Sequence, residues 1–480
     1  MIATGKKISP ITIIICMLLS GLAWYISDGL NGDYWWLLWI APTPILFITF
    51  QSSWKQAFII SFIAYLTGRL SWFSYLINVA TLVPAIISIL VLCLVFALIT
   101  NGSRYVFLKN RSWPSVFAYP VFFTVFEYLL ISFSKDGSAA SIAYSQSDFL
   151  PLVQLASVTG ILGITFFVSF IPSAITLLLL YHKEQKQFKP LLITSILLIV
   201  IVISFGVVRL NSSTDNITVK VGMVALDESM HDMSAHPDFS KSMLAAKYYA
   251  QEITMLAMHG SKLVVLPERA LNMDTAEAGF IKNIMQSIAK QTHVYIVAGY
   301  TNMKNKDQRN SSLVVDTSGI VLKDYNKVHL VTGFENRFTP GDSIGLFSFE
   351  NIQAGTAICK DLDFPRYIQQ YGKSNVQFLC VPAWDFVTDD WLHSRMAILR
   401  GVENGFAEVR AARQGRLTIS DAYGRVSAEA NTSTGKRTTL EGNVSTEKLN
   451  TVYSKWGEWF GILNVIAAIA LLLFVTRNKD

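Results

Sequence analysis

Three residues in the second half of the chain are of types that together support acyl transfer. Cys359 follows a short apolar run in GTAICKDLDFPR, Glu268 ends the apolar run of VVLPER, and Lys327 precedes another in YNKVHLVTGFE. A thiol is a useful acyl-transfer nucleophile only if a base takes its proton and a cation or N–H group stabilises the tetrahedral oxyanion. Glu268 and Lys327 are candidates for these tasks, because catalytic groups of α/β folds gather at the carboxyl edge of a sheet.

A single cysteine at the end of a strand is also typical of inert packing. Cys16 and Cys93 fall within long apolar segments, which leaves Cys359 and Cys380 for the polar part of the chain. Two cysteines are too few for a disulfide framework, and a bridge between them would leave Cys359 without a reactive thiol. The sequence contains no His or Cys cluster with zinc-site spacing such as HExxH, so we expect no metal and no other cofactor.

The elements that position these residues include a large membrane part. The 480 residues are 51% hydrophobic and 15% charged, with a mean hydropathy of +0.38, which is far more apolar than a soluble protein. Several apolar blocks approach the ~20 residues that a bilayer-spanning helix needs. We predict eight transmembrane helices, seven within residues 1–210 and the last within residues 456–480. The blocks are 9–26, 34–50, 57–76, 83–100, 115–133, 160–181, 190–208 and 459–476.

Basic residues divide unevenly between the two sides of these spans. With the amino terminus in the cytoplasm, the short loops on the opposite side contain a single basic residue, Lys135. The cytoplasmic side receives Lys6, Lys7, Lys55, Arg104, Lys109, Arg111, Lys183, Lys186, Lys189, Arg477 and Lys479. The positive-inside rule then predicts cytoplasmic termini and an extracytoplasmic segment 211–455. The first block is interpreted as an uncleaved helix, since removing it as a signal peptide leaves an odd number of spans. The formal charge of +6, without a Lys/Arg-rich run, argues against a nucleic-acid partner.

Residues 211–455 have the pattern of an α/β domain. Strand-like runs alternate in places with helical stretches, and we predict layers of helix over sheet. The loop 431–448, rich in Thr, Ser, Asn and Gly, is predicted to be mobile. The strand-like runs are 219–226, 262–268, 294–300, 312–319, 354–359 and 376–384, and the helical stretches are 240–259, 276–291 and 389–404.

Two charged residues fall inside predicted spans. Arg69 lies about 14 residues into the third span and Glu127 about 15 into the fifth, so at ~1.5 Å per residue both reach a similar depth. Isolated charges in a bilayer are costly, which favours either a structural ion pair or contacts with lipid headgroups.

Several motifs resemble the nitrilase, or carbon–nitrogen hydrolase, superfamily, and within it the apolipoprotein N-acyltransferase family. Glu268, Lys327 and Cys359 resemble the Glu-Lys-Cys set of the superfamily. The eight spans narrow the resemblance to the membrane-bound family, as do GRLSWFSYLI, FFTVFEYLL and LVQLASVTGILGITFFV in the amino-terminal part. The resemblance covers nearly the whole chain and implies an α/β nitrilase-like αββα sandwich for residues 211–455.

The resemblance implies an activity and roles for the trio. Glu268 is expected to be the general base, Lys327 the oxyanion stabiliser and Cys359 the nucleophile. The implied reaction moves an acyl chain from a phospholipid, through a thioester, to the amino-terminal amine of a diacylglyceryl-modified apolipoprotein. The implied location is the bacterial plasma (inner) membrane.

Four further residues are implicated by the same resemblance. Glu335, eight residues after Lys327, either orients that lysine or is an exposed loop acid, and Asp361 is a second candidate for orienting it. The stretch AWDFVTDDWLHSRMAILRGVENGFAEVRAARQG supplies Trp384 and His393 as candidate substrate-binding residues.

Some residues depart from the family pattern and keep other functions open. Lys360-Asp361 replaces a Tyr-Glu pair, so the carboxylate is one methylene shorter, and TGFENRFTPGD and Val-Pro-Ala before Trp384 are typical of soluble nitrilase relatives. One alternative is therefore a membrane-anchored carbon–nitrogen hydrolase, or amidase. Another is a non-catalytic membrane protein that retains the domain for binding.

Overall fold

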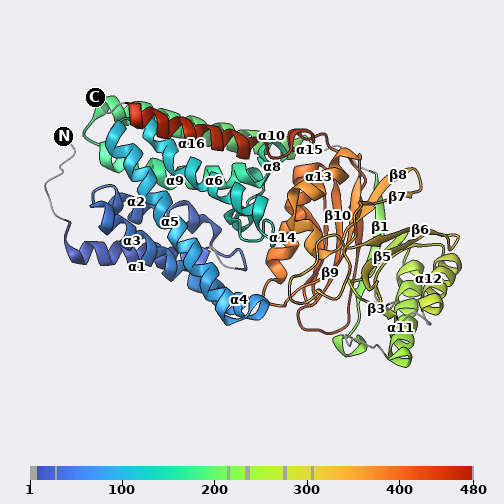
Figure 1. Ribbon diagram of the computed structural model, residues 1–480. Helices are drawn as coiled ribbons and strands as arrows, with labels where there is room; N and C mark the ends of the chain where they lie inside the picture. The colour runs from blue at the N-terminus through green and yellow to red at the C-terminus, as the bar shows by residue number, and fades with distance from the viewer. Residues whose placement is uncertain are drawn as a thin grey trace. The chain divides into compact units, whose positions relative to one another are not determined.

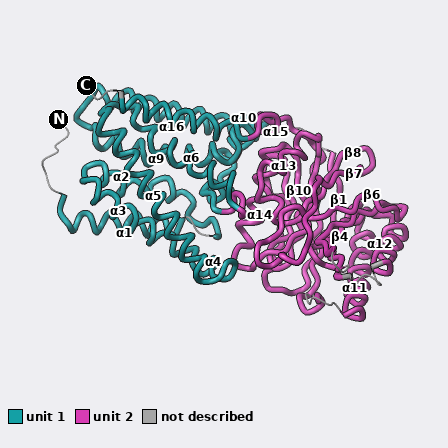
Figure 2. Tube along the Cα trace, viewed as in Figure 1, with its two compact units in different colours: residues 1–134, 140–212, 458–480 teal, residues 135–139, 213–457 magenta. Residues whose placement is uncertain are grey.

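The computed structural model describes residues 8–27, 30–212, 217–232, 238–273, 278–303 and 307–477 (Figure 1). The chain forms two compact units (Figure 2). Unit 1 comprises residues 1–134, 140–212 and 458–480, and unit 2 comprises residues 135–139 and 213–457. A five-residue segment between two helices of unit 1 thus belongs to unit 2.

Unit 1 is helical. Within the described residues, seven helical stretches are long and apolar enough to cross a membrane. Most of its residues lie in α1 (Pro10–Ser27), α2 (Thr43–Thr49), α3 (Trp54–Arg69), α4 (Phe73–Ala80), α5 (Leu82–Asn110), α6 (Ala118–Phe133), α7 (Leu150–Val153), α8 (Ala156–Thr159), α9 (Ile161–Tyr181), α10 (Gln185–Asn211) and α16 (Trp459–Arg477).

The predicted second span, 34–50, differs from the others because it is broken. A 3₁₀ helix, η1 (Trp35–Trp39), is followed by α2, and Pro42 stands between them as the N-cap of α2. Proline lacks the N–H that a continuous helix would need and fixes its own φ, so the apolar run cannot form one straight helix. Within the described parts of the chain there are therefore seven long apolar helical stretches and one broken segment, where we predicted eight spans.

Contacts between side chains fix the directions of the first helices. A Cβ atom on Gly21 of α1 would lie 2.8 Å from Thr67 of α3, and one on Gly68 would lie 2.4 Å from Trp24. The carboxyl halves of α1 and α3 therefore lie together, so the two helices run in the same direction. The broken segment returns the chain between them, and Thr176 of α9 donates to the backbone of Thr43 at 3.4 Å.

Three further pairs of helices are antiparallel. Thr100 of α5 donates to Ser61 of α3 at 2.8 Å, and the Arg104 guanidinium donates to the backbone oxygen of Ser52, just before α3. These contacts make α3 and α5 antiparallel. The pairs formed by α6 with α9 and by α6 with α16 are also antiparallel, as the following contacts establish: Thr165 to Glu127, Ser173 to Val116, Gly461 against Tyr128, and Val475 against Ala118.

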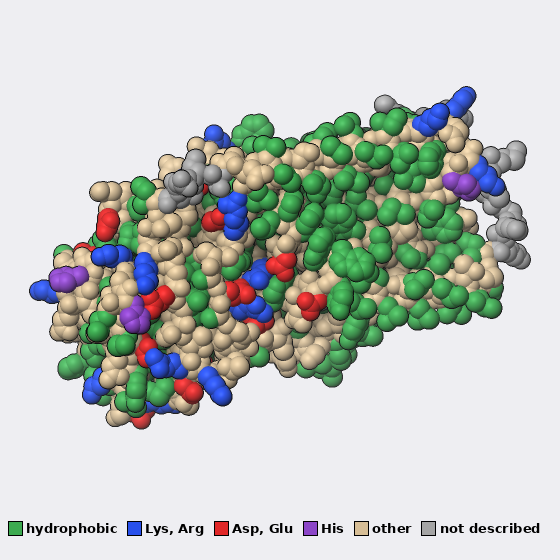
Figure 3. All heavy atoms as spheres, turned by 180° about the vertical axis from the view of Figure 1, so that it is seen from behind, with side chains coloured by type: hydrophobic (Ala, Val, Ile, Leu, Met, Phe, Trp, Pro, Cys, Tyr) green, Lys and Arg blue, Asp and Glu red, His purple; other side chains and the backbone are tan. Residues whose placement is uncertain are grey.

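The surface of unit 1 is apolar. In Figure 3, hydrophobic side chains cover the face of the long helices that is in view, whereas most of the Lys, Arg, Asp, Glu and His side chains gather over unit 2. Leu18 of α1, Leu98 of α5, Ile193 of α10 and Leu473 of α16 are each more than half exposed. Contiguous exposed apolar surface of this extent is expected of helices that face lipid.

The two charged residues of the predicted spans are buried among polar partners. Glu127 accepts hydrogen bonds from Ser141 at 2.7 Å, from the backbone of Ile142 at 2.8 Å and from Thr165 at 2.5 Å. Arg69 donates to the hydroxyl of Tyr65 at 2.6 and 2.9 Å. Each charge thus has hydrogen-bonding partners inside unit 1, as an ionised group in an apolar layer requires.

Unit 2 contains two sheets and four principal helices. One sheet has the order β13-β1-β2-β4-β5-β6, with β3 paired to β4, and the other has the order β12-β11-β10-β9-β8-β7. The strands are β1 (Thr218–Ala225), β2 (Leu263–Val265), β3 (Leu271–Met273), β4 (Tyr295–Asn302), β5 (Arg309–Val315), β6 (Val321–Asn326), β7 (Gly345–Phe349), β8 (Ile352–Thr356), β9 (Phe378–Trp384), β10 (Ala407–Arg413), β11 (Arg416–Ser420), β12 (Val426–Asn431) and β13 (Thr438–Ser445). The helices are α11 (Phe239–Met258), α12 (Ala278–Thr292), α13 (Pro365–Lys373) and α14 (Asp390–Asn404), with the short α15 (Val452–Trp456) near the end.

Three hydrophobic clusters hold these layers together. The central cluster joins the inner faces of the two sheets, for example Val265 and Val297 of the first with Phe378 and Val409 of the second. A second cluster packs α11 and α12 on the first sheet, and a third packs α13 and α14 with the second sheet. The predicted αββα layering is confirmed, and it follows from strands that are apolar on both faces.

The prediction of a mobile loop over residues 431–448 is wrong for half of that length. Thr438–Ser445 forms β13, which pairs with β1 in register over eight residues, from Thr218 opposite Ser445 to Ala225 opposite Thr438. The composition of this stretch suits a turn, but the exposed edge of β1 offers unpaired N–H and C=O groups that a strand can satisfy.

Candidate active site

Cys359 lies at the start of a tight turn. The strand β8 ends at Thr356, and Cys359 is the first residue of the 3₁₀ helix η6 (Cys359–Asp363), with φ +42°. Left-handed backbone is uncommon for a residue with a side chain and is often found at functional sites. The predicted strand, 354–359, therefore ends earlier than expected, and the turn lifts the thiol out of the sheet. Cys359 and Cys380 are both free thiols.

Asp361 holds this turn against the segment that follows Lys327. One carboxylate oxygen accepts from the backbone N–H of His329 at 2.8 Å, and the other accepts from Ile358 at 3.0 Å and from the hydroxyl of Tyr325 at 2.7 Å. The shorter side chain of Asp361 thus reaches the backbone beside the lysine and positions Lys327 through the chain.

Glu268 projects from the carboxyl end of β2. Its backbone N–H donates to Ala383 of β9 at 3.2 Å, which links the two sheets at the site. A Cβ atom on Gly299 of β4 would lie 2.1 Å from the Pro267 oxygen and 2.7 Å from the Glu268 Cα. Only glycine lets β4 approach this closely, and the side chain of Glu268 remains just 3% exposed.

Lys327 lies between two glutamates. Its Nζ atom is 2.7 Å from Glu268 Oε1 and 2.9 Å from Glu335 Oε2, and the side chain is 1% exposed. Burial alone lowers the pKa of Lys327, but the two carboxylates outweigh it and hold the pKa well above its usual range. Lys327 in turn keeps the pKa of the buried Glu335 carboxyl below its ordinary value. The structure therefore brings Glu335 into the site as a partner of the lysine.

Asn310 of β5 is a site residue that the sequence analysis did not identify. Its side-chain amide donates to Glu268 Oε1 and to Glu335 Oε1, both at 2.6 Å. Its backbone oxygen accepts from the N–H of Lys327 at 2.9 Å. One amide thus connects the two carboxylates and the lysine. The only sequence signal was a polar residue at the start of a strand, which many strands share.

The surroundings of Cys359 favour the neutral thiol at rest. Its Sγ atom donates to the backbone oxygen of Trp384 at 3.5 Å. Burial, followed by the negative charge of Glu268, raises the pKa of Cys359 well above its usual value, although Lys327 opposes this. The ion pair of Asp385 with Arg410, at 2.6 Å, adds one charge of each sign nearby. Formation of a thiolate therefore needs a base.

Trp384 is the last residue of β9 and lies beside Cys359. Its indole N–H donates to Gln414 at 2.7 Å. The guanidinium carbons of Arg413 and Arg269 lie 4.0 and 5.5 Å from the centre of its ring. Both arginines are buried, and neither was predicted from the sequence.

His393 faces acidic side chains from the first turn of α14. Its ring lies 2.9 Å from Asp389, and 12% of its side chain is exposed. Burial by itself lowers the pKa of His393, but Asp389, with Asp363 and Asp385, raises it to about 9. The imidazole is therefore a cation at neutral pH, paired with Asp389. Among the described residues, no group of three or more His, Cys, Asp or Glu side chains could hold a metal ion.

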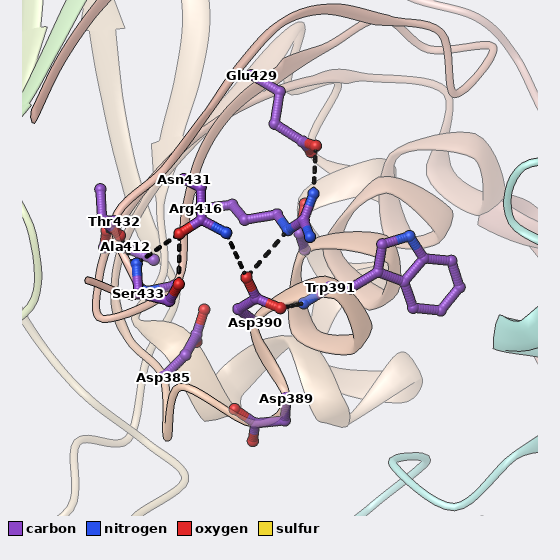
Figure 4. A network of polar contacts seen from close by, with 12 residues as sticks. Asp385, Asp389, Asp390, Trp391, Ala412, Arg416, Glu429, Asn431, Thr432 and Ser433 are labelled. Atoms are coloured by element: carbon purple, nitrogen blue, oxygen red, sulfur yellow. Dashed lines mark hydrogen bonds and ion pairs between the residues drawn. The ribbon is translucent and has the colours of Figure 1, made fainter. Parts of the chain in front are cut away.

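A network of polar contacts anchors the start of α14 (Figure 4). Asp390 accepts from the backbone of Trp391 at 2.6 Å and from Asn431 at 2.8 Å, and Arg416 reaches both Asp390, at 3.4 Å, and Glu429, at 2.7 Å. The helix that carries His393 is thus fixed to β11 and β12. The same network holds Asn431, at the start of the stretch predicted to be mobile.

Comparisons with known proteins cover both units. The family model described as "Apolipoprotein N-acyltransferase N-terminal domain" matches residues 18–175, and the one described as "Carbon-nitrogen hydrolase" matches residues 222–452. The chain is 23% identical to an apolipoprotein N-acyltransferase of Geobacter metallireducens over 92% of each chain. It is 24% identical to an apolipoprotein N-acyltransferase of Thermotoga maritima, over 92% of this chain and 90% of that protein. A crystal structure of an amidase from Nesterenkonia sp. matches 53% of this chain and all of its own, with 15% identity and a TM-score of 0.44.

Proposed function

Because the chain belongs to the apolipoprotein N-acyltransferase family, we propose that it transfers an acyl chain from a phospholipid to the amino-terminal amine of a lipid-modified cysteine on a lipoprotein. The family predicted from the sequence motifs is confirmed, and the chain is an acyltransferase of the carbon–nitrogen hydrolase type. The observation that carries the proposed chemistry is the position of Lys327, 2.7 Å from Glu268 and 2.9 Å from Glu335.

In the first half-reaction, Glu268 takes the thiol proton of Cys359, and the thiolate attacks the ester carbonyl carbon of the phospholipid. This proton transfer moves the negative charge from Glu268 to sulfur, so the charge of the buried group as a whole does not change. The ammonium of Lys327 stabilises the oxyanion of the tetrahedral intermediate. When the ester C–O bond breaks, Glu268 returns the proton to the departing oxygen, and a lysophospholipid leaves behind a thioester on Cys359.

In the second half-reaction, the amine of the lipoprotein attacks the thioester carbonyl. Glu268 accepts a proton from the nitrogen, Lys327 again stabilises the oxyanion, and the C–S bond breaks. The proton on Glu268 returns to the sulfur of Cys359, which restores the resting thiol. Glu335 and Asn310 hold Lys327 and Glu268 in place through both steps, by the contacts at 2.6–2.9 Å.

The proposed topology has eight membrane crossings, including the broken segment of η1 and α2. The parallel directions of α1 and α3 support it, because the chain must cross back between them. With a cytoplasmic amino terminus, unit 2 then lies outside the cytoplasm and α16 returns the chain inward. Lys6, Lys7 and Lys479, which contribute to the charge asymmetry, lie outside the described residues. An acyl chain loses ~0.8 kcal/mol per CH₂ when it leaves lipid for water, so membrane helices suit an enzyme that handles long chains.

The amidase alternative, based on the TPGD and VPAW stretches, is not favoured. Both named relatives match over 92% of the chain, which includes the helical unit as well as the catalytic domain. A protein that only binds its ligands is disfavoured by the buried Glu268–Lys327–Glu335 group, since even paired charges are costly to desolvate and contribute little to stability, so that a chemical use is the better reason for them.

The proposal is tested by trapping the acyl-enzyme. The purified full-length protein, incubated with a phospholipid labelled in its acyl chains, is expected to retain label at Cys359 in peptide mass spectrometry. Cys359→Ala is expected to retain none, whereas Cys380→Ala, which removes the buried thiol of β9, should retain as much as the wild type. Addition of a diacylglyceryl-cysteinyl peptide should then release the label as an N-acyl peptide. Absence of label from the wild type would contradict the proposal.

A further inference from the structure

Guanidinium groups and aromatic rings contact one another in a group that we call the ladder, and it consists of Arg413, Arg269, Arg337, Trp384 and Phe338. The proposed mechanism uses none of the three arginine charges. Arg413 and Arg269 both lie over the ladder's first ring, Trp384, with guanidinium carbons 4.0 and 5.5 Å from its centre. Arg269 also lies 5.3 Å from the centre of Phe338, and Arg337 lies 5.0 Å from the same ring. Three guanidinium groups are thus held by two aromatic side chains.

Of the two buried arginines of the ladder, Arg413 pairs with Glu228 at 3.5 Å, whereas no carboxylate at ion-pair distance from Arg269 is found within the described residues. Arg269 is 5% exposed, and its Nε atom is buried without a hydrogen-bond partner within the described part of the chain. The other cations of the site have carboxylates at 2.6–2.9 Å: Lys327 has Glu268 and Glu335, Arg410 has Asp385, and His393 has Asp389. A buried donor that forms no hydrogen bond is costly, which indicates that a ligand supplies the partner.

The backbone at Arg269 supports a functional position. Its φ is +53°, a left-handed conformation that costs an ordinary residue free energy and persists where the surrounding structure enforces it. Burial lowers the pKa of Arg269 to about 10, with Arg413 contributing in the same direction, so the guanidinium is charged at neutral pH. An anion placed between these cations would relieve their mutual repulsion.

Arg269 and Cys359 both contact Trp384, which is compatible with the chemistry of the proposed donor. Arg269 follows Glu268 directly, and the Cys359 thiol donates to the backbone of Trp384, on whose ring Arg269 lies. In a glycerophospholipid, about five or six covalent bonds separate the attacked carbonyl carbon from phosphorus, which amounts to roughly 6–8 Å at ~1.5 Å per bond. Guanidinium groups bind phosphate through paired N–H donors, and contact with a ring through the guanidinium face leaves those donors available.

We propose that Arg269, with Arg337 and Arg413, forms a subsite for the phosphate diester of the acyl donor and of the lysophospholipid that leaves. This inference rests on the proposed function and adds a residue that selects the donor. It also assigns a use to the Arg that follows the catalytic glutamate, a position for which the sequence analysis gave no role.

The test compares two donors that differ in the phosphate. Acyl-enzyme formation by the full-length protein in detergent is measured with dioleoyl phosphatidylglycerol and with dioleoylglycerol. The recorded ratio is kcat/KM for the phosphatidylglycerol divided by kcat/KM for the diacylglycerol. Arg269→Gln is expected to lower that ratio about tenfold, the effect of losing one charge-assisted hydrogen bond. Arg269→Lys should restore part of it. Arg437→Gln is the matched control, because Arg437 pairs with Glu252 on the surface, at 2.7 Å, and should keep the wild-type ratio.

A second variant and a free-phosphate arm complete the test. Arg337 is exposed, so Arg337→Gln should fold normally and lower the same ratio by a smaller factor. Inorganic phosphate should slow labelling from phosphatidylglycerol more than from dioleoylglycerol in the wild type, and this difference should disappear in Arg269→Gln. An unchanged ratio in both variants would overturn the subsite, as would equal inhibition of both donors by phosphate. Failure of the wild type to label with either donor would instead overturn the proposed function.

Discussion

The carboxylate of Asp361 accepts the backbone N–H of His329 at 2.8 Å, two residues beyond Lys327. This contact joins the turn that carries the proposed nucleophile, Cys359, to the segment that carries Lys327, the proposed oxyanion stabiliser. Because Asp361 is fully buried and also accepts from Tyr325 and Ile358, it fixes the distance between the two segments.

Asp361→Ala is therefore expected to reduce acyl-enzyme formation about 100-fold, since a misplacement of about 1 Å between reacting groups can have an effect of that size. It should also lower the unfolding temperature, because buried N–H groups lose their acceptors. Single-turnover labelling and thermal unfolding of the same preparations check both effects. Labelling at the wild-type rate in a destabilised variant would mean that Asp361 serves stability alone.

Removal of the bridging amide should change the pH dependence of the reaction. Asn310 donates to both Glu268 and Glu335, and its hydrogen bond is one of the interactions that keep the pKa of Glu335 low. In Asn310→Ala, the pKa of Glu335 should rise. The acidic limb of the pH–rate profile, where activity falls as the pH is lowered, should therefore lie at a higher pH than in the wild type. We expect about a tenfold decrease in kcat at neutral pH, the effect of losing one hydrogen bond to a charged group. A decrease without any shift of the acidic limb would contradict this role.

His393 should make the stability of unit 2 depend on alkaline pH. Its pKa in the folded protein, about 9, lies above the usual histidine value of 6.5, so its stabilising contribution is complete below pH 6.5 and is lost as the pH rises through 9. The unfolding temperature of the wild type should therefore fall between pH 7 and pH 10 by more than that of His393→Gln. Parallel curves for the two proteins would show that the pair with Asp389 contributes nothing.

Gly299→Ala tests the close approach of β4 to the catalytic glutamate. The added Cβ would lie 2.1 Å from the Pro267 oxygen, and neither backbone can move without moving Glu268. We expect a loss of stability of roughly 1–3 kcal/mol or more, together with a large loss of activity. Gly279→Ala in α12 is the matched control, since a Cβ there meets nothing within 4 Å and alanine favours helix. Equal behaviour of the two variants would contradict the proposed constraint.

Local patterns predicted the layers of helix over sheet in unit 2 and made Glu268, Lys327 and Cys359 candidates, whereas the αββα order and the proposed roles of the trio came from the family resemblance. Strands such as β4 and β9 are continuous apolar runs, and the Pro-Glu step and the lone cysteine follow such runs directly. The turn at Cys359 was not predictable in this way. Its residues continue the apolar pattern of β8, and the side chains that end the strand come from Asp361 and from the distant Tyr325.

Other features escaped prediction because distant contacts decide them. Residues 438–445 have a loop-like composition, but pairing with β1 makes them a strand. Asn310 and Arg269 are ordinary polar residues in sequence, and only the fold brings them to Glu268 and Trp384. The broken second span depended on Pro42, whose effect on a helix was visible in the sequence but whose neighbours were sufficiently apolar to suggest a single span.

The segment 135–139, which belongs to unit 2, has a consequence for exchanging parts between relatives. Ser138 donates to the backbone oxygen of Asp363 at 2.7 Å, Asp136 pairs with Lys360 at 2.6 Å, and a Cβ on Gly137 would lie 2.3 Å from that same oxygen. A hybrid enzyme that takes its helices from one species and its catalytic domain from another would therefore join a foreign loop to the turn of the nucleophile. Such hybrids should work only when this loop travels with the domain that carries the cysteine.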